Sequence, residues 1–154
     1  MKKIELLCFG ELKFKELQGL ENHYLKRISY FADFRKTLFK DVKIKDEKQK
    51  KEAEAKLVRG HIKGGDFLVA LDERGRTYSS QGFSDWLDER FSFQSGKMIF
   101  LIGGHAGIAE SLKPVIREQI SFSKMTFPHD LFRVVFLEQL YRAFTIKKGI
   151  QYHR

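Results

Sequence analysis

Three consecutive residues near the end of the chain have side chains that suit acid–base chemistry and anion binding. Tyr152, His153 and Arg154 supply an aromatic ring, an imidazole that can give or take a proton, and a guanidinium. Arg142 precedes them in an amphipathic run, four residues after Glu138. At that spacing it is either half of an ordinary surface ion pair or an anion clamp beside the tail. A lone histidine near a chain end is more often simply exposed, so the group matters only if other elements complete it.

A second group of residues follows two continuous apolar runs that read as buried strands. Leu71–Gly75 comes after the first run, and Gly103–Gly107 comes after the second. Ligands of open α/β sheets lie beyond the carboxyl ends of the strands, and glycines let the backbone approach such a ligand closely. The same glycines also fit a plain strand-to-helix turn. The spacing matches neither the dinucleotide fingerprint nor a P-loop.

The segment Ser121–Pro128 alternates polar and apolar residues before a proline that suits the first turn of a helix. Its hydroxyl groups could cap that helix or bind a ligand. No histidines and cysteines stand at metal-ligand spacing, so the sequence predicts no metal site. No Gly-x-Ser-x-Gly motif is present either, which argues against an acyl-serine enzyme.

The elements that must position these residues alternate between strands and helices. The patterns predict strands over 2–9, 34–42, 66–71, 97–102 and 120–125. They predict helices over 14–28, 47–62, 80–91 and 108–118, and a final helix that begins at Pro128 and ends by Gly149. This alternation favours an α/β fold with a mostly parallel sheet flanked by helices. We expect residues 1–154 to form one domain.

Positive charge is concentrated at the two ends of the chain. The net charge is +9 overall, with +7 in residues 1–63, −3 in residues 64–110 and +5 in residues 111–154. Basic ends attract a polyanion such as a nucleic acid, although a merely soluble basic protein has the same excess.

Several features of the sequence favour a cytoplasmic protein. Its one cysteine, Cys8, cannot form an intramolecular disulfide and reads as a small core residue. The first apolar run is too short for a secretion signal, and no segment reaches the roughly 20 apolar residues that cross a bilayer.

Taken in order, the motifs resemble those of the ribosomal large subunit methyltransferase H family, small members of the SPOUT class of S-adenosylmethionine-dependent RNA methyltransferases. The resemblance covers essentially the whole chain. The motifs are specific to this family when they occur together in this order, whereas no single motif is. The segments that carry it are Tyr24-Leu-Lys-Arg27, Leu71-Asp72 with Gly75, Phe100-Leu-Ile-Gly-Gly104 with Gly107, Ser121-Phe-Ser-Lys-Met-Thr-Phe-Pro-His129, Glu138-Gln-Leu-Tyr-Arg142 and Tyr152-His153-Arg154.

The resemblance implies a deep trefoil knot in the C-terminal half, with S-adenosylmethionine held against the knot loops. It also implies a homodimer in which the tail of one subunit completes the site of the other. The substrate would be a pseudouridine of large-subunit ribosomal RNA, methylated at N3 within the assembled ribosome. Mapped onto this sequence, the methyl-donor positions are Leu71, Gly103, Phe122, Ser123, Lys124, Met125, Thr126 and Phe127.

The residues expected to act on the base are Arg142, Tyr152, His153 and Arg154. Either arginine could stabilise negative charge on a carbonyl oxygen of the base, His153 could accept the N3 proton, and Tyr152 could stack on the ring. His105-Ala106 departs from the pattern of relatives and receives no role.

Two other functions stay open. The chain could be a non-catalytic RNA-binding or ribosome-assembly factor that uses its basic ends, in which case it would not bind S-adenosylmethionine. It could also be an α/β enzyme that acts on a small anionic metabolite, in which case RNA would not affect its activity.

Overall fold

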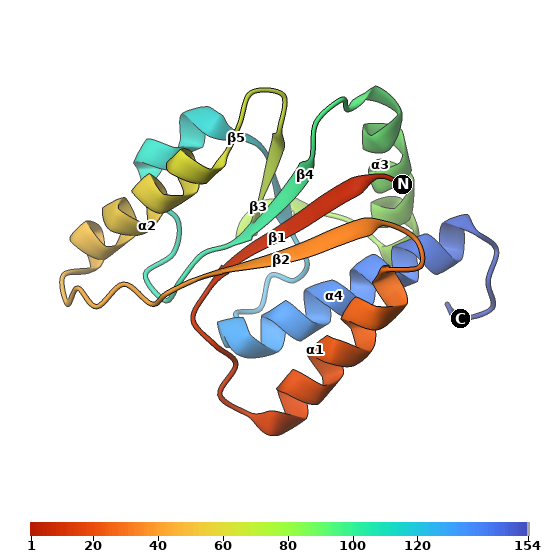
Figure 1. Cartoon of the computed structure of the whole chain (residues 1–154), viewed down its shortest axis with the longest axis horizontal. Helices are drawn as coiled ribbons and strands as arrows, with labels where there is room; N and C mark the ends of the chain where they lie inside the picture. Colours follow the sequence, from red (N-terminus) through yellow and green to blue (C-terminus); the bar gives the residue numbers. More distant parts are fainter. Residues whose placement is uncertain (154) are drawn as a thin grey trace.

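The computed structural model describes residues 1–153, which form one five-stranded sheet with helices on both faces (Figure 1). The strands are β1 (Lys3–Phe9), β2 (Asp33–Phe39), β3 (Phe67–Thr77), β4 (Met98–Ile102) and β5 (Ile116–Ser121). The helices are α1 (Lys15–Ile28), α2 (Glu47–His61), α3 (Ser80–Phe93), α4 (His129–Lys147) and the short 3₁₀ helix η1 (Glu110–Val115). Most predicted elements are therefore confirmed, with shifted boundaries.

All strand pairings in the sheet are parallel, and the strand order is β2-β1-β4-β3-β5. This confirms the predicted α/β class with a parallel sheet. Because the strands run the same way, their carboxyl ends meet at one edge, where the connecting loops can build a site. The knot implied by the family resemblance stays a prediction.

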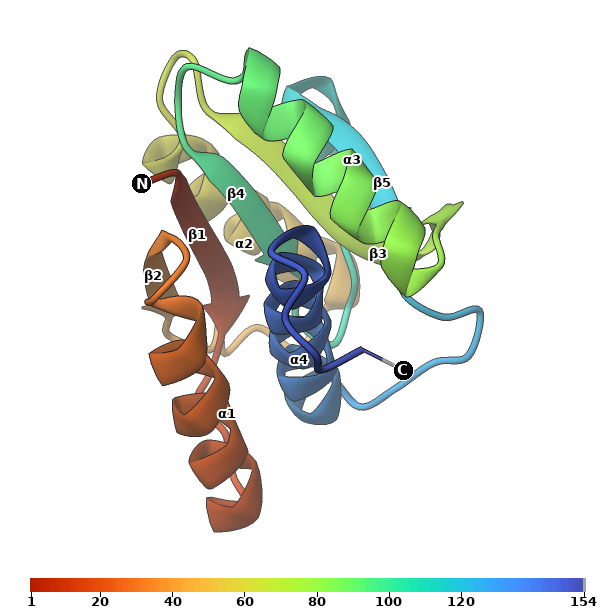
Figure 2. The same ribbon diagram turned by 90° about the vertical axis from the view of Figure 1, so that its right-hand side faces the viewer.

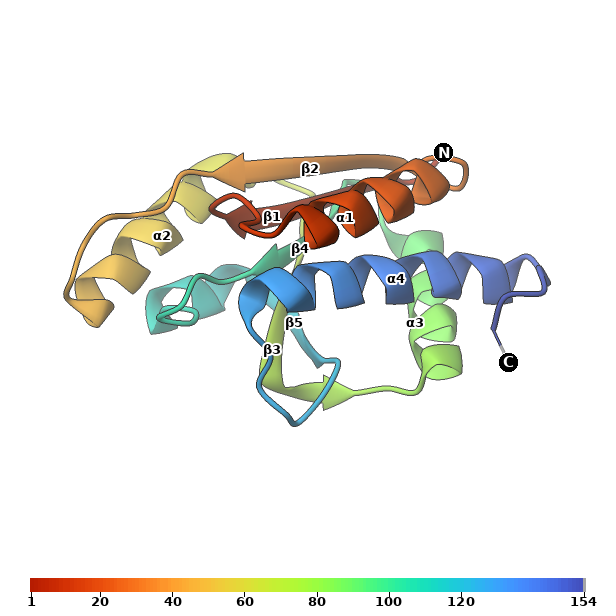
Figure 3. The same cartoon turned by 90° about the horizontal axis from the view of Figure 1, so that it is seen from below.

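The sheet separates two hydrophobic cores, as strands that are buried on both faces require. One face of β1, with Ile4, Leu6 and Cys8, packs under α1, α3 and α4. The opposite face, with Leu7 and Phe9, packs under α2 and η1. Figures 2 and 3 show α1 and α4 side by side on the first face, with α3 on the other side of α4.

The region between β4 and α4 differs from the sequence prediction. The helix predicted over 108–118 is wrong, since only the 3₁₀ turn η1 forms before β5 begins at Ile116. Pro114 lies inside η1, and its missing N–H group and ring stop an α-helix from propagating. The strand predicted over 120–125 is wrong in its second half, because β5 ends at Ser121 and the chain then loops to α4.

Strand β3 is longer than predicted because four residues bulge out of its pairing with β5. Leu71 and Arg76 are both in register with Ile120, so residues 72–75 leave the ladder between them. Gly75 is required at the base of this bulge, since a Cβ atom there would lie 2.6 Å from the Gln119 carbonyl carbon. The bulge carries Asp72 and Glu73 out of the ladder between β3 and β5.

Two buried ionic groups fix helices to the sheet. Arg133 of α4 is 1% exposed, donates to the Gly10 carbonyl at 2.8 Å and pairs with Glu21 of α1 at 3.7 Å. On the other face, Glu5 of β1 is 1% exposed and accepts hydrogen bonds from Lys97 at 2.6 Å and from Thr37, with the His61 ring nitrogen at 2.8 Å. Burial alone would raise the pKa of Glu5, but these hydrogen bonds outweigh it and lower the pKa to about 2.

The Glu5 carboxylate is expected to make the stability of the fold sensitive to acid. The pKa of Glu5 falls from 4.5 in the unfolded chain to about 2 in the folded protein. The stabilisation of the fold by this carboxylate is therefore complete above pH 4.5 and is lost as the pH falls to about 2. The loss amounts to about 3 kcal/mol. The free energy of unfolding of Glu5→Gln should therefore fall less steeply over this range in urea titrations. Glu11→Gln, at an exposed position, should keep the wild-type slope; equal slopes for all three proteins would refute the prediction.

No helix within residues 1–153 is both long enough and apolar enough to cross a membrane.

Candidate functional site

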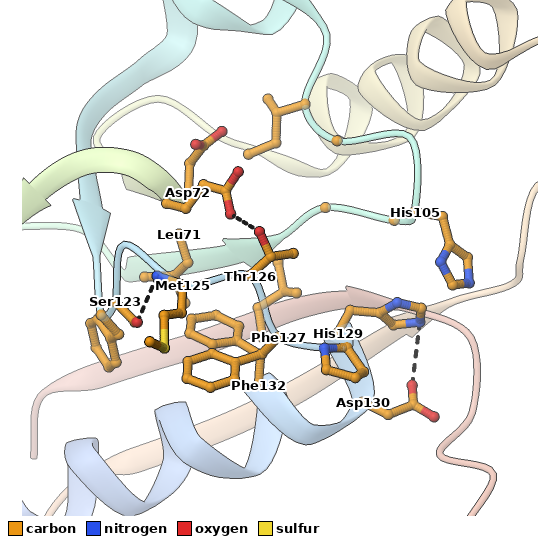
Figure 4. Close-up of a pocket in the computed structure, with 18 of the residues that line it drawn as sticks. Leu71, Asp72, His105, Ser123, Met125, Thr126, Phe127, His129, Asp130 and Phe132 are labelled. Carbon is orange, nitrogen blue, oxygen red and sulfur yellow. Dashed lines mark hydrogen bonds and ion pairs between the residues drawn. The ribbon is translucent and has the colours of Figure 1, made fainter.

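A large pocket lies at the carboxyl end of β4, beside the bulge of β3 and the start of α4 (Figure 4). Its volume is about 970 Å³, at the upper end of the range for ligand pockets. Three segments form most of its wall: the β3 bulge, the turn after β4, and the loop between β5 and α4. The pocket therefore occupies the edge of the sheet where parallel strands present ligand-binding loops.

The structure brings together seven of the eight residues that the resemblance assigns to the methyl donor. The seven that line the pocket are Leu71, Gly103, Phe122, Ser123, Met125, Thr126 and Phe127. Lys124, the eighth, is exposed and does not line it. Figure 4 shows side chains of the β5–α4 loop facing Leu71 across the pocket.

Hydrogen bonds hold the β5–α4 loop in place. The Ser121 hydroxyl donates to the Ser123 carbonyl at 2.8 Å, and the Met125 N–H donates to the Ser123 hydroxyl oxygen at 2.9 Å. The Thr126 hydroxyl donates to the Glu73 carboxylate at 2.6 Å, which ties the loop to the β3 bulge. Two walls of the pocket are thus joined by side chains that alternate with the apolar residues of the loop.

The pocket also has an acidic edge. Hydrogen bonds from Arg74 lower the pKa of Asp72 although partial burial opposes them, so this carboxylate is charged at neutral pH. Glu73 lies beside it on the bulge, and both residues line the pocket. Because Arg74 pairs with Asp72 at 3.1 Å, Glu73 is the carboxylate of this edge that suits a ligand with positive charge, and the apolar walls suit the uncharged part of such a ligand.

Two histidines meet where the turn after β4 approaches the start of α4. The rings of His105 and His129 pack edge to face with their centroids 4.2 Å apart, and His129 also lies 3.3 Å from Asp130 (Figure 4). Burial and the neighbouring His105 lower the pKa of His129. His105 received no role from the sequence, yet it forms part of the pocket wall.

A second cluster forms where the tail folds back on α4. The Arg142 guanidinium pairs with Glu138 on the same helix and donates to Nδ1 of His153 at 3.1 Å. The Tyr152 hydroxyl donates to the same Glu138 carboxylate at 3.1 Å, and its ring packs against Tyr141. Three of the four residues expected to act on the base, Arg142, Tyr152 and His153, therefore lie close together, whereas Arg154 lies outside the described residues.

Glu138 is the residue that sequence reasoning undervalued. Its spacing from Arg142 was the available signal, but that spacing is common on helix surfaces. Its carboxylate is the shared acceptor that orders the tail cluster.

The shared acceptor leads to a prediction about Tyr152. Burial, followed by hydrogen bonding to Tyr24 and Glu138, raises the pKa of the Tyr152 phenol. Glu138→Gln removes the negative charge that opposes phenolate formation, so the pKa of Tyr152 should fall. Each protein is titrated with base and followed by ultraviolet absorbance, and so is its Tyr152→Phe derivative. Subtracting the second curve from the first leaves the titration of the Tyr152 phenol. Glu16→Gln on the exposed surface of α1 should leave the titration unchanged, and an unmoved pKa in Glu138→Gln would refute the arrangement.

The pocket and the tail cluster lie at opposite ends of α4. His129 at the first turn lines the pocket, and Arg142 follows it by thirteen residues on the same helix. At about 1.5 Å of rise per residue, roughly 20 Å separates them. Figure 3 shows the same arrangement, with the tail beyond the end of α4 that is farther from the β5–α4 loop. One chain therefore does not bring the two groups of predicted residues into a single site.

Among residues 1–153, no three histidine, cysteine, aspartate or glutamate side chains are grouped so that they could hold a metal ion.

Comparison with known proteins identifies relatives along the whole chain. The family described as "Predicted SPOUT methyltransferase" matches residues 1–153. "Ribosomal RNA large subunit methyltransferase H" of Christiangramia forsetii is 39% identical over 153 residues, which cover 97% of this chain and 98% of that protein. The proteins of the same name from Caldicellulosiruptor saccharolyticus and Flavobacterium johnsoniae are each 38% identical. They cover 98% and 97% of this chain, and 99% and 98% of their own lengths.

Proposed function

The chain belongs to the SPOUT methyltransferase family, and we propose that it transfers a methyl group from S-adenosylmethionine to N3 of a pseudouridine in large-subunit ribosomal RNA, within the assembled ribosome. The names of its relatives support ribosomal RNA of the large subunit as the substrate. The choice of pseudouridine N3 and of the assembled ribosome rests on the family resemblance of the sequence motifs. The basic ends of the chain suit a polyanionic substrate.

The observation that carries the proposal is the pocket itself, because its wall gathers residues from three separate segments that were assigned to the methyl donor. The residues present fit S-adenosylmethionine in chemical type. Apolar side chains such as Leu71 and Phe122 suit a purine ring, and the Glu73 carboxylate suits a ligand that carries cationic groups. When bound, this methyl donor supplies a methyl group on a sulfonium, which needs no further activation.

The tail residues are proposed to prepare the base for attack. N3 of pseudouridine carries a proton between two carbonyl groups and must lose it. Three of the five N–H groups of Arg142 are engaged with Glu138 and His153, which leaves the others for a carbonyl oxygen of the base. A hydrogen bond of this kind stabilises the negative charge that develops when the proton leaves. The partly exposed ring of Tyr152 is proposed to orient the base.

The contact between Arg142 and His153 also determines what the imidazole can do. A guanidinium only donates hydrogen bonds, so Nδ1 of His153 must accept, and the neutral ring carries its proton on Nε2. In this arrangement His153 donates from Nε2 to an acceptor on the base. To accept the N3 proton, the imidazole would have to use Nδ1 after release from Arg142, or the proton would have to pass to another group such as water.

A homodimer is proposed because the two halves of the site are separated within one chain. A second subunit that packs along α1 and α4 could place its tail beside the first subunit's pocket, as the resemblance implies. Apolar side chains left exposed on this side support such packing. They are Phe14 and Leu20 of the α1 region, Met125 and Phe127 of the β5–α4 loop, and Leu131 of α4.

Methyl transfer from labelled S-adenosylmethionine tests the proposal. The substrates are intact ribosomes that lack the modification and naked ribosomal RNA from the same ribosomes, with mass spectrometry to locate the label. Label on one pseudouridine, in ribosomes only, is the expected result. Label on another nucleotide or equal labelling of naked RNA would overturn the finer assignment. A protein that does not bind S-adenosylmethionine would overturn the proposal at its first step.

A further inference from the structure

A buried carboxylate lies directly behind the turn that forms one wall of the pocket. Glu54 projects from α2 on the face of the sheet opposite to α4, and it is only 4% exposed. The helix is rich in lysine and glutamate, which are mostly exposed in proteins, and Glu54 departs from that pattern. Its neighbours on the same helix face, Ala55 and Val58, belong to the second hydrophobic core.

The Glu54 carboxylate has no full hydrogen-bond partner among residues 1–153. Neither oxygen atom accepts a hydrogen bond of normal geometry, although the Gly104 N–H lies close enough to lower the pKa somewhat. Burial dominates and raises the pKa of Glu54. The cavity that it shares with Ile108 and Leu112 measures about 10 Å³, so at most about one water molecule could fit there. Such a group costs stability, and an apolar side chain would pack better among these neighbours.

The carboxylate touches the turn at the residue where it enters the pocket wall. A Cβ atom on Gly104 would lie within 2.9 Å of both carboxylate oxygens, so a larger residue there would have to displace the Glu54 side chain. Gly104 begins a tight turn, in which the Gly107 N–H donates to its carbonyl at 3.0 Å and Gly107 has φ +86°. Gly103, Gly104 and Gly107 all line the pocket on the other side of the same backbone.

We propose that Glu54 is a positioning residue for the methyl-donor site, whose carboxylate holds the backbone of the Gly103–Gly107 turn from behind so that its front edge faces the methyl donor. This inference rests on the proposed use of the pocket. The carboxylate accepts from backbone N–H groups of the turn when the methyl donor fills the pocket and presses the turn against α2. The carboxylate oxygens of Glu54 are thus unpaired in the free protein and accept hydrogen bonds in the bound state. The free energy that it costs to bury them unpaired therefore favours binding of the methyl donor.

The test compares Glu54→Leu and Glu54→Gln with the wild type. Leucine removes both acceptor atoms, whereas glutamine keeps one, so affinity for S-adenosylmethionine should fall in the order wild type, Gln, Leu. We expect a loss of about tenfold or more for leucine by calorimetry. The thermal midpoint of Glu54→Leu should equal or exceed that of the wild type. Glu52→Gln is the matched control, since Glu52 is exposed on the same helix, and its affinity should not change.

Hydrogen exchange of the turn amides provides a readout that does not depend on activity. With methyl donor present, residues 103–107 should be less protected in Glu54→Leu than in the wild type, while β1 and α4 stay equally protected. Affinity within about twofold of the wild type, or protection of the turn unchanged by the substitution, would overturn the proposal. Loss of stability together with loss of affinity in both variants would show an ordinary structural role instead. A wild-type protein that binds no S-adenosylmethionine would refute the proposed function, whereas a wild type that binds it with the same affinity as both Glu54 variants would refute the role of Glu54 alone.

Discussion

Two variants that are each inactive are expected to restore activity when they are mixed. Gly103→Val damages the pocket, because a Cβ atom at this position already meets Ile108 at 3.0 Å and a larger side chain must displace the turn. Arg142→Ala damages the tail cluster at the other end of α4. If the pocket of one subunit works with the tail of its partner, a mixed dimer retains one complete site. Random pairing of equal amounts should then give about a quarter of the wild-type activity.

The complementation experiment has an internal control. Arg142→Ala mixed with His153→Ala should stay inactive, because each subunit of that dimer has an intact pocket but a damaged tail. The subunits should be exchanged by denaturation and refolding, and mixed dimers should be verified by mass spectrometry of the intact complex. Mixed dimers of Gly103→Val and Arg142→Ala without activity would contradict a site shared between subunits. Full activity of either variant alone would contradict its role in the site.

Much of the pocket could be predicted from the sequence because its residues follow recognisable strands. The apolar runs before Leu71 and Gly103 form β3 and β4, which are neighbours in the sheet. Parallel neighbours bring their carboxyl ends together, so two motifs that are about thirty residues apart had to meet. The β5–α4 loop was less predictable. Its alternating pattern suggested a strand over 120–125, whereas the loop residues are held by their own hydroxyl groups and by Glu73.

The relation between the pocket and the tail could not be predicted from local patterns. The length of α4 determines their separation, and the motif order gives no sign that one chain holds them roughly 20 Å apart. The same limit applies to buried charges. Glu54 and Arg133 lie in segments whose periodicity is helical, and only the packing of those helices reveals that both side chains are enclosed. Charged residues are mostly exposed, so a sequence reading assigns them to solvent by default.

The two buried charges also differ in what they do for the fold. Arg133 is only partly paired, with Glu21 and the Gly10 carbonyl, and it connects α4 and α1 to the end of β1. Glu54 connects nothing by a hydrogen bond of normal geometry, but it contacts the turn that lines the pocket. A buried charged group that links helices to a strand helps to fix their arrangement. A buried carboxylate without a hydrogen-bond donor lowers the stability of the fold and links nothing. That contrast is why the second charge, rather than the first, indicates a function at the pocket.

Replacement of Arg142 by lysine should separate binding of the methyl donor from turnover. The guanidinium contacts Glu138 through Nε and Nη2 and reaches His153 through Nη1, a geometry that a single ammonium group does not reproduce. Loss of one well-placed hydrogen bond to the developing charge lowers kcat by about 10²- to 10³-fold in comparable sites. We expect a fall of that size for Arg142→Lys, while affinity for S-adenosylmethionine stays within about twofold of the wild type, since Arg142 does not line the pocket and is proposed to contact the base.

The matched control for Arg142→Lys is Lys147→Ala, which removes an exposed cation five residues farther along α4 that pairs with Asp88 of α3. This substitution changes the net charge of the same helix without touching the tail cluster, so kcat should remain at the wild-type level. Single-turnover methylation of ribosomes at saturating S-adenosylmethionine measures the step directly. A wild-type rate for Arg142→Lys would show that the positive charge alone suffices. A rate lost together with affinity for the methyl donor would instead place Arg142 in the binding of that ligand, at the pocket that its tail completes.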